Sequence, residues 1–125
     1  MNLNFSFIIL FLASGTTAVL GNLLLKSGMN SLGNFELSIN TLVPTVTKFI
    51  GNWQLVVGFL LYGLSSILYL KLITTGEVTK IYPAVVSYMF IVLLILGTIF
   101  LKESFTWTKV VGIMIILFGI FFVSQ

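Results

Sequence analysis

Six polar residues inside long apolar stretches are the first candidates for chemistry in this sequence. Asn22 and Lys26 lie one helical turn apart, so they share a face if this stretch is helical. Four more recur at the i, i+3, i+4 and i+7 positions of another stretch: Tyr62, Ser65, Ser66 and Tyr69. An amide, an ammonium and hydroxyls bind polar or anionic groups through hydrogen bonds and charge. The pattern therefore predicts binding rather than covalent catalysis.

The composition excludes most catalytic and metal-binding chemistry. The chain has no cysteine and no histidine, which removes disulfides, thiolate metal sites and histidine-centred acid–base catalysis. Its six lysines are scattered along the chain, so the net charge of +3 does not indicate nucleic-acid binding. We expect no enzyme activity, no metal, no cofactor and no nucleic-acid partner.

Each of these polar residues also has a structural explanation. A serine or tyrosine in a membrane span can have a purely structural role, in which its hydroxyl joins two helices. A lysine at the end of a span can anchor the helix at the lipid headgroups. For Lys26 the functional alternative is an ammonium at the rim of a cavity, where it meets a phosphate. Gly112 and Gly119 lie on one helical face and predict close helix packing, within the chain or between two copies.

The elements that would position these residues are membrane spans. The chain of 125 residues is 58% hydrophobic and 7% charged, whereas about a quarter of a soluble domain is charged. A bilayer core about 30 Å thick needs about 20 apolar residues. The charges leave four stretches, which predict spans at approximately residues 5–25, 49–70, 81–101 and 105–124. We therefore expect an all-α integral membrane protein with four transmembrane helices in a compact bundle and short loops.

The longest connection, residues 27–48, carries a helical pattern of its own. Apolar residues recur through and just beyond it at helical spacing: Ile39, Leu42, Val43, Val46 and Ile50. This pattern predicts an interfacial helix, which must begin near residue 40 or 41 because Pro44 fits only a first turn. The first span is longer than a secretory signal core and lacks a basic amino end, so we expect it to be retained.

Four segments are spread in order over the whole chain: Gly21-Asn-Leu-Leu-Leu-Lys26, Ile81-Tyr-Pro83, Leu101-Lys-Glu-Ser104 and Gly112-Ile-Met-Ile-Ile-Leu-Phe-Gly119. Together, at these distances, they resemble the drug/metabolite transporter superfamily. The resemblance implies a four-helix membrane transporter.

Two branches of that superfamily compete. Small multidrug exporters carry a proton-exchanging glutamate and a tryptophan where this chain has Ala18 and Val85, and a glycine-rich bend where it has residues 87–89. The subunits that flip undecaprenyl-phosphate aminoarabinose lack that glutamate, open their third span with Tyr-Pro as at Tyr82, and carry a glutamate that Glu103 resembles. The resemblance thus adds Tyr82 and Glu103 to the candidate substrate-binding residues. The absence of a carboxylate from every predicted span also argues against proton-coupled export.

We therefore predict a flippase for a polyprenyl-phosphate-linked sugar or a similar anionic lipid, embedded among membrane lipids as a multi-pass protein of the inner (cytoplasmic) membrane. A proton-coupled small multidrug exporter and a non-transporting accessory subunit are the alternatives. Four spans are few for a route that opens to each side in turn, so we expect a homodimer, antiparallel if both orientations insert, or a paralogous heterodimer. The lysines divide four against two between the membrane faces, which is a weak orientation bias.

Overall fold

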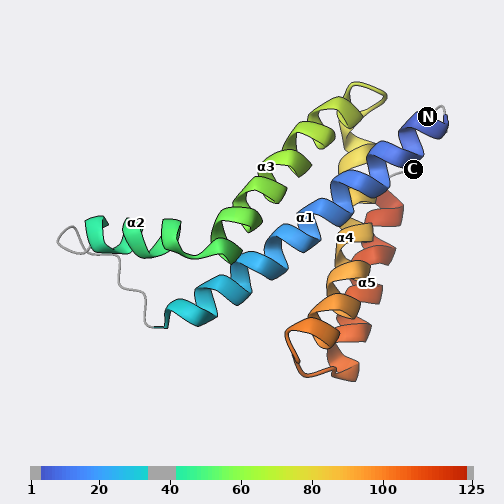
Figure 1. Ribbon diagram of the computed structural model, residues 1–125. Helices are drawn as coiled ribbons and strands as arrows, with labels where there is room; N and C mark the ends of the chain where they lie inside the picture. Colours follow the sequence, from blue (N-terminus) through green and yellow to red (C-terminus); the bar gives the residue numbers. More distant parts are fainter. Residues whose placement is uncertain (1–3, 34–41, 124–125) are drawn as a thin grey trace.

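The computed structural model describes residues 4–33 and 42–123, and every regular element among them is an α-helix (Figure 1). The helices are α1 (Phe5–Leu32), α2 (Leu42–Gly51), α3 (Trp53–Ile73), α4 (Val78–Phe100) and α5 (Trp107–Val123). The all-helical prediction is confirmed for these residues.

Three of the helices, α1, α3 and α4, are long and apolar enough to cross a membrane. α5 is also apolar but has 17 residues, which makes it about 25 Å long, shorter than a bilayer core of about 30 Å. The fourth predicted span thus corresponds to a shorter helix, which begins at Trp107 rather than at residue 105.

All three long helices extend beyond the predicted spans. α3 runs past residue 70 to Ile73, but it begins at Trp53 rather than at residue 49, because Asn52 caps its start and residues 49–51 belong to α2. α1 continues past residue 25 to Leu32 and ends at Gly33, whose φ of 72° is a left-handed conformation that glycine adopts without strain. α4 begins at Val78, so Pro83 lies inside the helix rather than at its start. Charged residues set the ends of the predicted spans, and the helices continue past those residues.

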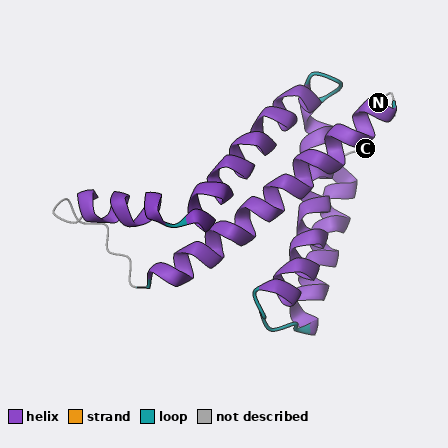
Figure 2. Ribbon diagram, in the orientation of Figure 1, coloured by secondary structure: helices purple, strands orange, loops and turns teal. Residues whose placement is uncertain are grey.

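α1 is the centre of the arrangement. It packs along α3, and α4 contacts it as well, while α5 packs against α4. α3 and α4 make few contacts with each other. The α4–α5 pair therefore spreads away from the α1–α3 pair toward the loop that joins α4 to α5 (Figure 2). This arrangement is more open than the predicted compact bundle, because α3 and α4 are linked mainly through α1.

Glycines bring the backbones of α1 and α3 into close contact. A Cβ added to Gly21 would lie 3.0 Å from the carbonyl oxygen of Gly58, and one added to Gly58 would lie 3.0 Å from the backbone nitrogen of Leu25. Further along, a Cβ on Gly28 would lie 2.7 Å from Cδ2 of Leu55, which is fully buried. The crossing of the two helices therefore depends on small residues, as is common between membrane helices.

α2 is the helix that the apolar spacing predicts between the first two spans. Among the described residues it begins at Leu42, with Pro44 in its first turn; Ile39 and the predicted start near residue 40 lie outside them. α2 contacts α3 and runs at an angle to it (Figure 1). Val46 and Ile50 are 51% and 70% exposed. The helix is thus confirmed, and its place at the membrane surface, which this exposed apolar face favours, stays a prediction.

Candidate functional site

A groove of about 340 Å³ lies between α1, α3 and α4. The four polar residues that the sequence places on one face of α3 all line it, and Tyr82 lines it from α4. α1 contributes Ser14 and Ala18. Because α3 and α4 make few contacts with each other, the two helices form separate walls on either side of these α1 residues.

The two serines of α3 are hydrogen-bonded to backbone. The Ser65 hydroxyl, on a residue that is 7% exposed, donates to the carbonyl oxygen of Ser14 at 2.8 Å and so joins α3 to α1. The Ser66 hydroxyl donates to the carbonyl oxygen of Tyr62, one turn back in the same helix, at 3.0 Å. Ser65 thus has the structural role that was the alternative to substrate binding, since it joins two helices, although it also lines the groove.

The tyrosines supply the more accessible hydroxyls of the groove. Tyr62 and Tyr82 are 45% and 57% exposed. Tyr69 and Tyr82 meet edge to face, with ring centroids 6.2 Å apart, so they join α3 to α4 across the groove. Within the described part of the chain, no residue hydrogen-bonds to the three tyrosine hydroxyls. These hydroxyls can donate to and accept from a polar ligand.

Two apolar positions in the groove bear on the choice between transporter branches. Ala18 and Val85 line it and are 4% and 5% exposed. At these positions the multidrug exporters, by resemblance, carry the proton-exchanging glutamate and a tryptophan. A carboxylate at residue 18 would therefore lie in the groove, where this chain has a methyl group.

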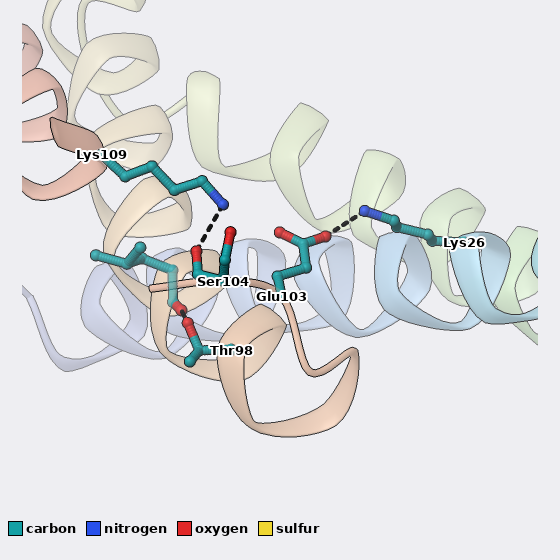
Figure 3. Close-up of polar contacts among 6 residues, drawn as sticks. Lys26, Thr98, Glu103, Ser104 and Lys109 are labelled. Carbon is teal, nitrogen blue, oxygen red and sulfur yellow. Dashed lines mark hydrogen bonds and ion pairs between the residues drawn. The ribbon is translucent and has the colours of Figure 1, made fainter. Parts of the chain in front are cut away.

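Asn22 and Lys26, in contrast, do not line the groove. They follow Ala18 along α1 at successive steps of four residues, so they lie one and two turns further toward the end of the helix. Asn22 is partly buried. The Lys26 ammonium instead forms an ion pair with Glu103 in the loop between α4 and α5 (Figure 3). The structure thus brings Lys26 and Glu103 together, apart from the residues of the groove.

The loop after α4 holds Glu103 toward Lys26. Lys102 adopts a positive φ of 53°, and the backbone nitrogen of Glu103 donates to the carbonyl oxygen of Gly97 at 3.4 Å. The Lys109 ammonium donates to the carbonyl oxygen of Ser104 at 2.9 Å (Figure 3). These contacts reverse the chain between α4 and α5.

The ion pair changes the titration of Glu103. The hydrogen bond from Lys26, with the charge of the same ammonium, lowers the pKa of the Glu103 carboxyl from its ordinary value, and Lys109 lowers it further. Because the folded pKa is depressed, any stabilisation from the pair is present above the pKa of an unfolded glutamate and is lost as pH falls through the lower, folded pKa. The pair is therefore intact at neutral pH.

A contact between α1 and α4 was not among the candidate site residues. The hydroxyls of Thr16 and Tyr88 lie 2.8 Å apart. A Cβ added to Gly15 would lie 2.5 Å from Cδ1 of the Tyr88 ring. Gly15 thus makes room for the ring. The glycine followed by a threonine at residues 15 and 16 is the sequence signal that could have indicated this contact.

The glycine pair of α5 has no neighbour within the described chain. A Cβ added at Gly112 or Gly119 would meet no atom within 4 Å beyond its own helical neighbourhood. Of the two predicted uses of this face, close packing inside the chain is therefore absent from the described residues. A contact with another chain stays a prediction.

Two known proteins are similar to this chain over most of its length. It is 28% identical over 124 residues to the probable 4-amino-4-deoxy-L-arabinose-phosphoundecaprenol flippase subunit ArnF of Proteus mirabilis (strain HI4320), which covers 91% of this chain and 88% of that protein. It is 33% identical over 119 residues to the uncharacterized protein y4nH of Sinorhizobium fredii (strain NBRC 101917 / NGR234), with 94% of each chain covered. No family model matches the chain, and no solved structure matches it significantly.

The apolar helices indicate a multi-pass membrane protein, and the similarity to a flippase subunit supports a class related to small membrane transporters. Within that class, the chain belongs to the same family as y4nH of Sinorhizobium fredii.

Proposed function

We propose that this protein is a subunit of a flippase for an anionic, lipid-linked molecule, most simply a sugar carried on polyprenyl phosphate. The observation that carries the proposal is the groove between α1, α3 and α4, which presents tyrosine hydroxyls and no charged side chain. Hydroxyls of this kind bind a sugar by exchanging hydrogen bonds with it. The lipid tail stays in the bilayer, while the headgroup passes between α3 and α4, which make few contacts with each other.

In this proposal Lys26 receives the phosphate. Its ammonium lies at the end of α1 that faces the α4–α5 loop, two turns from Ala18 in the groove. Asn22 lies between the two positions and offers an amide along the way. The Glu103 carboxylate forms an ion pair with the Lys26 ammonium, so the carboxylate and the phosphate compete for the same ammonium.

The working unit is proposed to be a dimer in the inner (cytoplasmic) membrane. Within the described residues, one chain lines the groove on three sides, with α3 and α4 as its walls and α1 between them. On α5, the face that carries Gly112 and Gly119 has no neighbouring helix among those residues. Transporters commonly build a route across the membrane from two repeats, and here the second copy or a paralogue supplies the other half. The relative from Proteus mirabilis is itself named a flippase subunit.

A non-transporting accessory subunit is the second candidate. It is favoured by Ser65 and Ser66, whose hydroxyls already bond to backbone carbonyls and serve the fold. The tyrosines distinguish the two candidates, because only transport needs their hydroxyls.

The test replaces groove tyrosines in purified protein. A fluorescent polyprenyl-phosphate sugar is placed in proteoliposomes, and flipping is followed as the headgroup becomes accessible to a membrane-impermeant quencher. Tyr62→Phe with Tyr82→Phe removes two hydroxyls from the groove and should slow flipping about tenfold, at about 1 kcal/mol or less for each hydrogen bond.

The matched control is Tyr88→Phe, which also removes a tyrosine hydroxyl but from the contact with Thr16 outside the groove lining. It should leave the flipping rate within about twofold of the parent if its hydrogen bond serves only packing. Flipping by the parent no faster than in protein-free liposomes would support the accessory subunit instead. Equal flipping by the parent and the Tyr62→Phe/Tyr82→Phe protein, both above protein-free liposomes, would show that the groove hydroxyls do not bind the headgroup.

A further inference from the structure

A second cleft, of about 280 Å³, lies between α4 and α5. It shares no lining residue with the groove between α1, α3 and α4. Its walls are apolar side chains of both helices, among them Phe90 and Leu94 on α4 and Ile113 on α5. A cleft with such walls at the outside of a membrane protein accepts hydrocarbon.

One end of this cleft is polar. Thr98, Glu103 and Lys109 line it there, next to the loop between α4 and α5 (Figure 3). The Glu103 carboxylate is already paired with the ammonium of Lys26, whereas Lys109 donates to a neutral acceptor, the carbonyl oxygen of Ser104. The ammonium groups of Lys26 and Lys109 therefore lie near a single carboxylate, that of Glu103, so the net charge at this end is positive.

Aromatic residues place this end at the level of the lipid headgroups. Phe105 and Trp107 meet edge to face with ring centroids 6.3 Å apart, and they are 55% and 78% exposed. Exposed aromatic rings beside lysines are typical of the membrane–water interface. The cleft thus has a positive end at headgroup depth and apolar walls that lead from there into the hydrocarbon.

We propose that the α4–α5 cleft binds an anionic glycerophospholipid of the surrounding bilayer, with an acyl chain between the helices and the phosphate on Lys109. The charge at the mouth favours an anionic headgroup over a zwitterionic one. This lipid is resident rather than transported, because the cleft has polar residues at one end only and offers no polar route across the membrane. The inference does not depend on the proposed flippase activity.

Quenching of Trp107 by brominated lipid tests the proposal. The chain has two tryptophans, so Trp53→Phe leaves Trp107, two positions before Lys109, as the single fluorophore. The protein is reconstituted in phosphatidylcholine bilayers with rising fractions of brominated phosphatidylglycerol or brominated phosphatidylcholine. Brominated phosphatidylglycerol should quench Trp107 at lower mole fraction than brominated phosphatidylcholine does.

Three substitutions in the Trp53→Phe background distinguish lipid binding in the cleft from a general attraction of anionic lipid to lysines. Lys109→Gln should weaken the preference for phosphatidylglycerol about fivefold, the effect of one interfacial lysine. Ile113→Phe, which fills the cleft but keeps Lys109, should abolish the preference. Lys102→Gln removes an exposed lysine from the same loop that does not line the cleft, and should have a smaller effect than Lys109→Gln.

Several results would overturn the proposal. They are equal quenching by the two brominated lipids in the parent, equal effects of Lys109→Gln and Lys102→Gln, and an unchanged headgroup preference in Ile113→Phe. Circular dichroism of each variant verifies that it is folded.

Discussion

At the scale of residues, the contact between Lys26 and Glu103 is exposed and stabilises the fold only weakly. The two side chains are 52% and 38% exposed, so water screens their charges and the pair adds little to the stability of the fold. The phosphodiester of a lipid-linked sugar carries the same single negative charge as a carboxylate, so it can take the place of the Glu103 carboxylate on the Lys26 ammonium. The pair is therefore suited to being replaced by an anionic headgroup rather than to holding the helices together.

Lys26→Gln should abolish flipping while leaving expression and oligomer size unchanged, because it removes the ammonium that would meet the phosphate. Lys26→Arg should retain part of the activity, since the charge persists with a different geometry. The flipping rate in proteoliposomes is the measurement. Lys48→Gln, which removes an exposed lysine of α2, is the control and should flip at the parent rate. Undiminished flipping by Lys26→Gln would make Lys26 a membrane anchor only.

At the scale of elements, the sequence predicted the helices better than the contacts between them. Lysines bounded the apolar runs, which is why spans near α1, α3 and α4 could be drawn, and the i, i+3, i+4, i+7 spacing correctly grouped Tyr62 with its neighbours along one wall of the groove. The partner of Lys26 lies 77 residues away, and nothing in local spacing indicates which loop a lysine will meet. The open spread of α4–α5 was missed for the same reason.

The crossing of α1 and α3 yields a prediction about stability. Gly58→Ala places a methyl group 3.0 Å from the Leu25 nitrogen and 3.1 Å from the Gly21 carbonyl oxygen, so the helices must separate. We expect a loss of about 1–3 kcal/mol in the free energy of unfolding, the usual cost of overpacking. Unfolding in mixed detergent micelles, followed by circular dichroism, measures it.

Gly63→Ala is the matched control for that experiment, since it lies in the same helix and an added Cβ there meets nothing within 4 Å. It should leave stability unchanged or raise it slightly through better helix propensity. If both substitutions behave alike, the close approach of α1 and α3 contributes nothing specific to the fold.

At the scale of the whole molecule, the open arrangement fits a subunit that is completed by another chain. In the predicted topology, four lysines share the membrane face of the α4–α5 loop: Lys26, Lys48, Lys102 and Lys109. Lys71 and Lys80 flank the turn between α3 and α4, which the same topology places at the other face. The first turn of α1 and the last turn of α5 lie on the side of that turn (Figure 1). Four lysines against two bias the orientation only weakly.

We therefore expect both orientations to occur and an antiparallel homodimer to form. The chain has no cysteine, so Thr75→Cys in the α3–α4 turn and Thr106→Cys in the α4–α5 loop give single labelling sites at opposite faces. An impermeant thiol reagent should label about half of each variant from outside intact cells. Labelling of one site only would exclude the antiparallel homodimer and leave a parallel dimer or a paralogous partner. A monomer by mass in mild detergent that still transports would exclude a dimer.

The most direct test of the central claim compares an anionic lipid with a cationic drug in the same proteoliposomes. The groove has Ala18 where a multidrug exporter carries its proton-exchanging carboxylate, so the protein should flip the polyprenyl-phosphate sugar and should neither export ethidium nor release protons when ethidium is added. Flipping that exceeds protein-free liposomes, without proton release, is the result that the account predicts. Stoichiometric proton release on ethidium binding, with no flipping of the lipid, would contradict it and identify a multidrug exporter.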